Sequence, residues 1–330
     1  MSPSSLTNDL LQLDAARECA RIEECIRDQM AGRLRRKGVV LGLSGGIDSS
    51  VSAALCAQAL GPERVLGLFM PEQDSHDNSL ALGRMLAQSL GIATELENIS
   101  AILEAAGCYH RRDEAIRSVV PEYGPGWKCK LVLADVLSGA QYALTSLVVE
   151  SPQGEQRKVR LTAQAYSQIV AATNFKQRTR KMLEYYHADR MQYAVVGTPN
   201  RLEYDQGFFV KNGDGAGDLK PIAHLYKTQV YQLAEFLQIP EAIRRRPPTT
   251  DTFSLAQSQE EFYFALPLRQ MDLCLYGKNH DLSAATIAAA AGLSEEQVER
   301  VYAAIVAKRR ATVYLHQFPL LVEQITEIQH

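Results

Sequence analysis

The sequence has little of what marks a secreted, membrane-embedded or nucleic-acid-binding protein. Its 330 residues hold six cysteines, and no two of them form a Cys-x-x-Cys pair or lie near a histidine at zinc-ligand spacing. Lys and Arg number 35 against 38 Asp and Glu, a net charge of −3, so there is no basic field for nucleic acid. The most apolar stretch, Ala284–Leu293, is too short to span a bilayer. These absences argue against a disulfide scaffold, a zinc module and a membrane span.

What remains is an ordinary globular composition, with 46% apolar and 22% charged residues. A chain of this length can bury a large apolar core without disulfides or structural metals. The first residues, MSPSSLTNDL, lack the basic and then apolar order of a secretory signal. We therefore expect a cytoplasmic protein with reduced cysteines, and a single domain over residues 1–330.

Short apolar runs alternate with helical patterns along much of the chain. The runs resemble buried strands of a parallel sheet, and the patterns between them have the spacing of amphipathic helices. This alternation predicts an α/β fold, a doubly wound parallel sheet with flanking helices, followed by a helical C-terminal part. The expected strands are 38–43, 64–70, 94–99 and 193–198, and the expected helices are 8–36, 48–61, 75–90, 162–188 and 228–237.

The alternation is interrupted between about residues 107 and 160. Two strand-like runs, 144–150 and 156–161, flank Ser151-Pro152-Gln153-Gly154, which predicts a β-hairpin. We interpret 107–160 as an insertion that carries this hairpin. A long connection of this kind is often functional, and the alternative is a surface elaboration or a dimer contact.

The segment Leu43-Ser44-Gly45-Gly46-Ile47-Asp48-Ser49-Ser50 follows an expected strand and opens an expected helix. Its glycines let the backbone approach a phosphate closely. Free N–H groups at the helix start and the serine hydroxyls form an anion site, and Asp48 is placed to hold Mg²⁺ on that phosphate. No Gly-Lys-Ser/Thr follows, so the loop is not a Walker A loop. The alternative is a glycine turn with a serine and aspartate cap.

This loop resembles the phosphate-binding motif of ATP pyrophosphatases, which cleave ATP between the α and β phosphates. Later segments resemble signatures of the NAD synthase family, in the family's order. Asn174 and Arg178 lie four residues apart and share one helical face, and Thr198 ends an expected strand, where ligands bind in open α/β sheets. The resemblance covers about residues 38–100 and 170–310, and its later signatures are Asn174–Arg180, Gly197–Glu203, Phe208–Asp218 and Pro248–Asp251.

The resemblance implies a fold like that of the adenine nucleotide alpha hydrolases. It also implies ATP- and Mg²⁺-dependent amidation of nicotinic acid adenine dinucleotide (deamido-NAD) to NAD through an acyl-adenylate, with ammonia as nitrogen donor and with release of AMP and pyrophosphate. The alternatives are an amide ligase of this type acting on another carboxylic acid, and a non-catalytic nucleotide sensor. A tRNA-modifying ligase is disfavoured because a Cys-x-x-Cys zinc module and a basic stripe are both missing.

The resemblance also implies residue roles. Asp48 and Glu203 would hold Mg²⁺, and Asp48 and Lys227 would be catalytic, with no covalent nucleophile. The family's His-Lys pair has its nearest match at Lys308, and Asp214 could alternatively stabilise a turn. The implied ATP-binding residues are Gly42, Leu43, Ser44, Gly45, Gly46, Ile47, Asp48, Ser49, Thr198, Lys227 and Thr249. The implied deamido-NAD-binding residues are Asn174, Arg178, Lys211, Asp214, Asp218 and Lys308.

Two departures concern the acid substrate. Gln259 stands where the family usually has Asp, and the aromatic stretch Phe262–Phe264 after it is either core or a stacking platform. The inserted block 107–160 leads into the helix of Asn174 and Arg178, so it could cover the acid site.

About 37 residues precede the first strand, so we expect no glutaminase domain, and ammonia comes free or from a separate amidotransferase. The resemblance further implies a homodimer. The expected partners are small molecules, namely ATP, deamido-NAD and ammonia, with no nucleic acid and no membrane.

Overall fold

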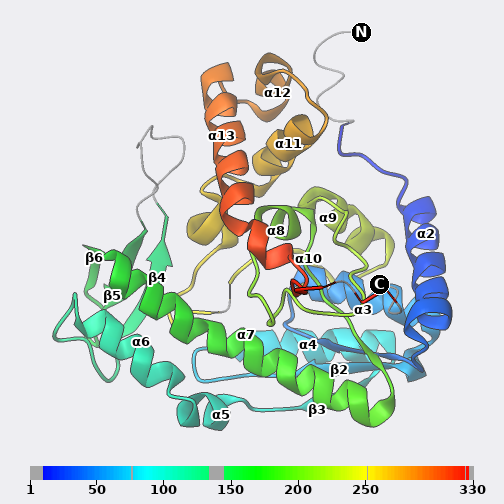
Figure 1. Cartoon of the computed structure of the whole chain (residues 1–330), viewed down its shortest axis with the longest axis horizontal. Coiled ribbons are helices and arrows are strands. Elements are labelled where there is room, and N and C mark those ends of the chain that lie inside the picture. Colours follow the sequence, from blue (N-terminus) through cyan, green and yellow to red (C-terminus); the bar gives the residue numbers. More distant parts are fainter. Residues whose placement is uncertain (1–9, 76, 134–144, 251, 324, 327–330) are drawn as a thin grey trace.

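A four-stranded parallel sheet forms the centre of the protein, in a computed structural model that describes residues 10–75, 77–133, 145–250, 252–323 and 325–326 (Figure 1). The strand order is β3-β2-β1-β7, and Val39 of β1 pairs with Val65 of β2 and with Ala194 of β7. The strands are β1 Val39–Gly42, β2 Val65–Phe69, β3 Ala93–Leu96 and β7 Ala194–Val195.

Helices cover both faces of this sheet because the residues of β1 alternate between two apolar cores. Val39 and Leu41 pack with α2, α3, α4 and α9, whereas Val40 packs with α5, α6 and α7. The predicted doubly wound α/β fold is therefore confirmed. The helices are α2 Ala15–Asp28, α3 Ile47–Leu60, α4 Asp77–Leu90, α5 Ser100–Ala105, α6 Cys108–Arg117, α7 Ala163–Met191 and α9 Lys227–Phe236.

A second, antiparallel sheet lies at one end of the long helix α7, at the left of Figure 1. Its strands run β4-β5-β6, and Glu150 of β5 pairs with Gln156 of β6, so these two strands form the expected hairpin. β4 was not expected, although the buried residues Cys129 and Leu131 alternate with Lys128 and Lys130, which is the pattern of a half-buried strand. The bounds are β4 Lys128–Val132, β5 Ser146–Glu150 and β6 Gln156–Arg160.

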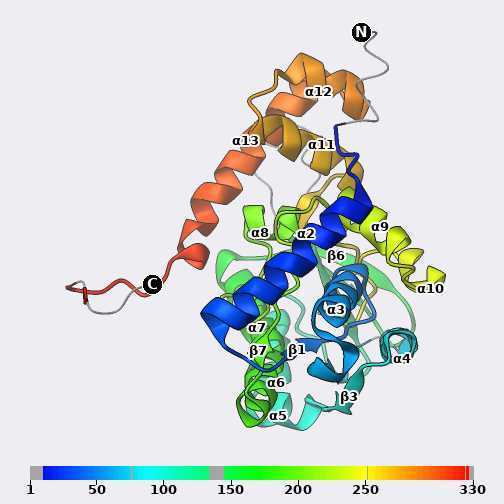
Figure 2. The same ribbon diagram turned by 90° about the vertical axis from the view of Figure 1, so that its right-hand side faces the viewer.

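The C-terminal helices enclose an apolar core of their own. Leu202, Cys274 and Ile305 lie at its centre, each at most 1% exposed. Beyond α13 the chain forms a 3₁₀ turn at Val313–His316, and the C-terminal segment then extends away from the helices (Figure 2). The helices of this part are α8 Arg201–Gln206, α10 Glu241–Arg244, α11 Leu268–Asn279, α12 Ala284–Ala291 and α13 Glu295–Thr312.

The first helix differs from the expectation of one helix over 8–36. It starts at Ala15, where the side chain of Asp14 accepts a hydrogen bond from the backbone N–H of Arg17 and caps the helix. Its end is a π-helical turn, Gln29–Leu34, followed by Arg35 in the left-handed region at φ +50°. Among the described residues, no helix is both long and apolar enough to cross a membrane.

Candidate active site

A cleft of about 810 Å³ opens where strands β1, β2 and β7 end. Gly42 and Phe69, the last residues of β1 and β2, line it, as does Thr198 just beyond β7. This is the edge at which open α/β sheets bind ligands. Of the residues singled out in the sequence, the cleft is lined by Gly42, Leu43, Ser44, Gly46, Ile47, Asp48, Ser49, Asn174, Arg178, Thr198, Glu203, Lys211, Asp214, Lys227 and Thr249.

The glycine loop leaves the start of α3 without a side-chain cap in the described structure. Gly46 is the N-cap residue, and no side chain caps the helix there. The hydroxyls of Ser49 and Ser50 instead donate to the Gly46 carbonyl oxygen, at 3.1 and 2.8 Å. Gly45 has φ +69°, and a Cβ at this position would lie 2.6 Å from the backbone oxygen of Ser79. The loop therefore has the geometry of an anion site at a helix N-terminus, and the serine and aspartate cap considered as its alternative is not formed.

Asp48 is held at the start of α3 by two donors. The ammonium of Lys227 donates to its Oδ2, and Nδ2 of Asn200 donates to its Oδ1 at 3.0 Å. The Lys227 side chain is only 1% exposed. Burial alone would lower the pKa of Lys227, but the carboxylates of Asp48 and Glu203 raise it above the usual lysine value. Lys227 is therefore a charged ammonium fixed at the loop.

Glu203 faces the same cleft from the first turn of α8. Its Oε2 accepts from the backbone N–H of Asn200 at 3.1 Å, the reciprocal half of a capping box, and its Oε1 accepts from Nε2 of Gln259 at 2.8 Å. Burial and the negative charge of Asp48 raise the pKa of Glu203 to about 8, against an opposing effect of Lys227. Asp48 and Glu203 thus interact across one cleft although they come from opposite halves of the sequence.

This pair of carboxylates fits a divalent cation. Burial and then repulsion from Asp48 raise the pKa of Glu203, and a cation between the two carboxylates would relieve the repulsion. Mg²⁺ commonly takes one or two protein carboxylates and completes its shell with phosphate oxygens and water. Within the part of the chain that the structure describes, no cluster of three or more His, Cys, Asp or Glu side chains could hold a metal alone. The donor set therefore suits an ion that arrives with a phosphate ligand.

Two cationic residues of the cleft wall, Arg178 and Lys211, are held by backbone carbonyl groups. Nε of Arg178 on α7 donates to the carbonyl oxygen of Lys211 at 3.2 Å. The Lys211 ammonium donates to the carbonyl oxygens of Tyr314 and Gln317, at 2.8 and 3.2 Å. Tyr314 and Gln317, which follow α13, thus contact the lysine that the family resemblance assigns to the acid substrate.

Asp214 shows the contact expected of its alternative role. Its Oδ1 accepts from the backbone N–H of Val210 at 2.8 Å and stabilises that turn, while the residue also lines the cleft. Burial raises the pKa of Asp214.

Three of the singled-out residues do not line the cleft. Gly45 forms the left-handed turn within the glycine loop. Asp218 is exposed, and its carboxylate accepts from the backbone N–H of Val195 at 2.8 Å and from the hydroxyl of Tyr185 at 3.2 Å. Lys308 donates to the carbonyl oxygen of Tyr263 at 2.6 Å, and burial lowers its pKa to about 7.

Two residues that shape the site were not singled out. Arg246 lies over the glycine loop and donates to the carbonyl oxygen of Ser44 at 3.3 Å and to Oγ of Ser79 at 2.8 Å. Asp272, with no exposed surface, accepts from the backbone N–H groups of Lys227 and Thr228 and so anchors the start of α9. No local pattern singled out either residue, because both act through contacts with segments far away in the chain.

The aromatic stretch 262–264 divides between the two roles considered for it. Phe264 is fully buried in the C-terminal core. Phe262 and Tyr263 line the cleft, and Phe208 stacks on Tyr263 with ring centroids 4.6 Å apart. The stretch is therefore partly core and partly cleft wall.

Known sequences match this chain over most of its length. The model of the family described as NAD synthase matches residues 18–120 and 146–311. An NH₃-dependent NAD⁺ synthetase from Mesorhizobium japonicum is 63% identical over 318 residues, which is 96% of this chain and 100% of the relative.

Comparison with solved structures gives the same fold. An NMN synthetase from Francisella tularensis superposes with a TM-score of 0.65 at 20% identity, covering 94% of this chain and 99% of the other. An NH₃-dependent NAD synthetase from Campylobacter jejuni, solved with nitrate, superposes with a TM-score of 0.60 at 22% identity, covering 94% and 100%.

Proposed function

Because the chain belongs to the NAD synthase family, we propose that it amidates deamido-NAD to NAD with ATP and ammonia. One observation carries the proposal at the level of the site. Asp48, Glu203 and Lys227, from α3, α8 and α9, converge in the cleft at the glycine loop. A protein that only bound a nucleotide would not need two half-buried carboxylates whose repulsion is costly.

The reaction we propose has two steps. A carboxylate oxygen of the acid attacks the α-phosphorus of ATP, and the bond from this phosphorus to the oxygen that bridges to the β-phosphate breaks. Pyrophosphate departs, and an acyl-adenylate remains. Ammonia then attacks the acyl carbon, the amide forms, a proton is lost to solvent, and AMP departs with one of the original carboxylate oxygens. Neither step needs a covalent nucleophile, so positioning and charge carry the catalysis.

Two anions must approach each other in the first step. The amides at the start of α3 and the loop hydroxyls bind phosphate oxygens, and Arg246 restrains the loop from outside. Lys227 is the mobile cation in this scheme, because an ammonium on a flexible stem can move from Asp48 to the departing pyrophosphate. Asp48 keeps this lysine charged in the free enzyme.

We propose that Asp48 and Glu203 hold Mg²⁺ in the working complex. The ion would supply charge neutralisation at the phosphates. Asn200 and Gln259 orient the two carboxylates, because each donates to a carboxylate oxygen.

The acid would bind at the part of the cleft wall where Asn174, Arg178 and Lys211 lie. Thr198 and Thr249 line the cleft beside the loop and suit the nucleoside part of ATP. Another carboxylic acid is the second candidate substrate, because the Francisella tularensis protein of the same fold is named for a mononucleotide product. Asp218 and Lys308, which do not line the cleft, are not part of the site that we propose.

A product assay tests the proposal. Purified protein with ATP, Mg²⁺, ammonium and deamido-NAD should form NAD, AMP and pyrophosphate in equal amounts. Nicotinic acid mononucleotide in place of deamido-NAD should give at least tenfold lower kcat/KM. Turnover with the mononucleotide and none with deamido-NAD would contradict the proposed acid.

We also propose that the enzyme is a cytoplasmic homodimer that uses free ammonia or a separate amidotransferase. Met182 and Tyr186 are 55% and 59% exposed on α7, the helix that carries Asn174 and Arg178, and such an apolar surface beside a site suits a subunit contact. Sedimentation at working concentration should give twice the mass of one chain, and a single-chain mass would contradict the dimer.

A further inference from the structure

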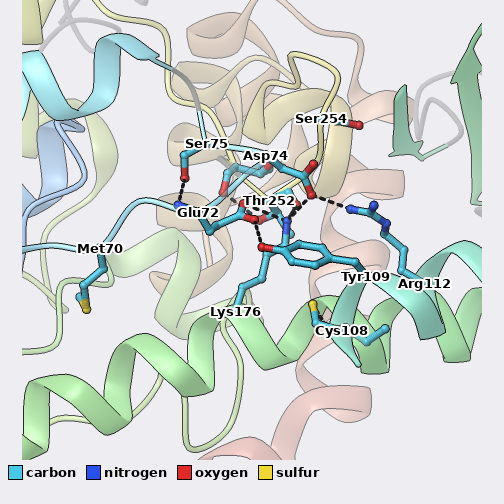
Figure 3. Close-up of polar contacts among 12 residues, drawn as sticks. Met70, Glu72, Asp74, Ser75, Cys108, Tyr109, Arg112, Lys176, Thr252 and Ser254 are labelled. Carbon is cyan, nitrogen blue, oxygen red and sulfur yellow. Dashed lines mark hydrogen bonds and ion pairs between the residues drawn. The ribbon is translucent and has the colours of Figure 1, made fainter. Parts of the chain in front are cut away.

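A buried ion cluster lies beside the cleft and has no role in the chemistry described above (Figure 3). Lys176 on α7 has no exposed side-chain surface. Its ammonium donates to Oε1 of Glu72 at 3.0 Å, to Oδ2 of Asp74 at 2.7 Å and to the carbonyl oxygen of Thr252 at 2.7 Å. These three contacts use all three donors of the ammonium.

The inserted block completes the cluster from α6. Arg112 contacts Oδ2 of Asp74 at 2.5 Å, and the hydroxyl of Tyr109 donates to Oε2 of Glu72 at 2.8 Å. Lys176 and Arg112 thus pair with the two buried carboxylates Glu72 and Asp74. Nε of Arg112 also contacts the more exposed carboxylate of Asp113 at 2.9 Å. Buried charges are tolerated only with such pairing, and removing one partner is strongly destabilising.

The cluster joins two segments that line the cleft. Glu72 belongs to the loop after β2, and Thr252 belongs to the stretch that runs from Thr249 to Gln259. Gln259 contacts the carboxylate of Glu203. Apart from an isolated bridge between Thr249 and Ser258, its described residues before Gln259 have no regular structure, and a π-helical turn, Glu260–Phe264, follows. Its position therefore depends on what holds it from outside.

The edge strand β4 of the inserted block also holds this stretch. The backbone N–H of Cys129 donates to Oγ of Ser254 at 2.9 Å, and the N–H of Leu255 donates back to the Cys129 carbonyl at 3.1 Å. The ammonium of Lys130 contacts Oε1 of Glu261 at 2.7 Å. Residues 252–261 are thus docked along β4 and tied to α7.

We propose that Lys176 is a positioning residue for the amidation, and that α6 and β4 of the inserted block form the platform on which it fixes residues 252–261 beside Glu203. A segment that is already in place costs no ordering free energy when ATP binds. The inference rests on the proposed function, because it assigns the platform to that reaction.

Two variants test it. Lys176→Met removes all three donated bonds but leaves an unbalanced carboxylate, so the chain could simply unfold. The double variant Lys176→Met/Glu72→Gln restores the balance, because Arg112 and Asp74 remain paired and Tyr109 can still donate to the amide oxygen. The double variant is therefore the decisive protein.

The first measurement is hydrogen exchange on the free protein, which needs no activity. We expect peptides over 249–261 to exchange at least tenfold faster in the double variant, with peptides over α3 unchanged. The second is steady-state kinetics, in which KM for ATP should rise at least tenfold while kcat falls less than threefold. Lys128→Met is the matched control, because this lysine pairs with Glu150 across β4 and β5 at 3.4 Å and does not contact residues 249–261. Lys130→Met should loosen the same peptides to a smaller extent.

Unchanged exchange over 249–261 in the double variant would overturn the proposal. Equal acceleration over α3 would also overturn it, because Lys176 would then be a general stabiliser. Faster exchange with unchanged KM for ATP would overturn the catalytic part. A wild-type protein that forms no NAD would instead refute the proposed function, and the exchange data would still report on the platform.

Discussion

At the scale of single residues, the carboxylate of Asp48 serves two cations, the Lys227 ammonium and the proposed Mg²⁺. It is paired with a buried ammonium in the free protein, and it is proposed to bind Mg²⁺ with Glu203 when ATP is present. A carboxylate that can exchange one cation for another lets Lys227 leave toward the pyrophosphate without stranding an unpaired charge.

Asp48→Asn tests both roles of this carboxylate, the pairing with Lys227 and the catalytic role. The amide keeps the size of the side chain, but it removes the counter-charge of the Lys227 ammonium, which should lower the free energy of unfolding by about 3–5 kcal/mol. The lost electrostatic stabilisation should lower kcat/KM by about 100-fold or more. Denaturant unfolding and the NAD-forming assay measure the two effects. Asp281→Asn, at an exposed position, is the control. Full activity in Asp48→Asn would contradict the assignment.

Lys308 gives a prediction for pH dependence. Burial lowers its pKa to about 7, whereas in the unfolded chain it titrates near 10.4. Between these values the unfolded state binds more protons, so the free energy of unfolding should rise with pH in this window. The contacts of Lys308 with the carbonyl and ring of Tyr263 favour the charged form and reduce the effect.

We therefore expect wild type to gain about 1–2 kcal/mol relative to Lys308→Met between pH 7 and pH 9. Urea unfolding of both proteins at the two pH values measures this difference, in which the other titrations cancel. An equal pH response of both proteins would show that Lys308 stays charged.

At the scale of elements, the glycine loop depends on one left-handed residue. Gly45→Ala adds strain at φ +69° and brings Cβ within 2.6 Å of the backbone oxygen of Ser79. Gly91 has a similar φ, +67°, but a Cβ there would meet no atom within 4 Å. Gly91→Ala should therefore cost about 1 kcal/mol from strain alone, and Gly45→Ala should cost at least about 2–3 kcal/mol.

Kinetics of the same two variants test whether the turn serves ATP. Gly45→Ala should raise KM for ATP at least tenfold, because the phosphate-binding amides follow the turn directly. Gly91→Ala should leave it unchanged. Equal KM values in the two variants would mean that the turn is needed only for folding.

The sequence predicted these elements well wherever local chemistry determines them. The strand, glycine loop and helix at 38–60 are set by an apolar run, by glycines and by a helical pattern, and all three form as expected. The hairpin forms where turn residues separate two strand-like runs. Strand β4 was missed because Gly and Pro precede it and its partner lies farther along the chain.

Contacts between distant segments were less accessible to sequence reasoning. Nothing local in the sequence indicates that Arg246 covers the loop or that Asp272 anchors α9, because both contacts join segments far apart in the chain. Asp218 matched a signature, yet its carboxylate binds the backbone of β7 instead of lining the cleft. A motif indicates which residues are present, and only the packed fold determines where each side chain points.

At the scale of the whole molecule, the cleft joins two apolar cores. Asp48 starts a helix of the core around the sheet, whereas α8, which carries Glu203, packs into the C-terminal core through Leu202. A ligand held by both sides should stabilise the folded chain as a unit.

Thermal unfolding should reveal this coupling. At about 100 times its Kd, Mg²⁺-ATP should add about 2.7 kcal/mol to the free energy of unfolding and raise Tm by several degrees. Glu203→Gln should lose most of this increase, because the carboxylate that holds the ion from the C-terminal side is removed. Addition of EDTA should abolish it in wild type. An equal shift in the variant would place the metal elsewhere.

The central claim, that this cleft activates a carboxylate as an acyl-adenylate, is tested most directly by following an oxygen atom. Deamido-NAD labelled with ¹⁸O in its carboxylate is converted with ATP, Mg²⁺ and ammonia, and the masses of the products are measured by mass spectrometry. We predict that one labelled oxygen appears in AMP and none in pyrophosphate. Unlabelled ADP together with labelled inorganic phosphate would mean that the acid attacks the γ-phosphorus, and would contradict the account.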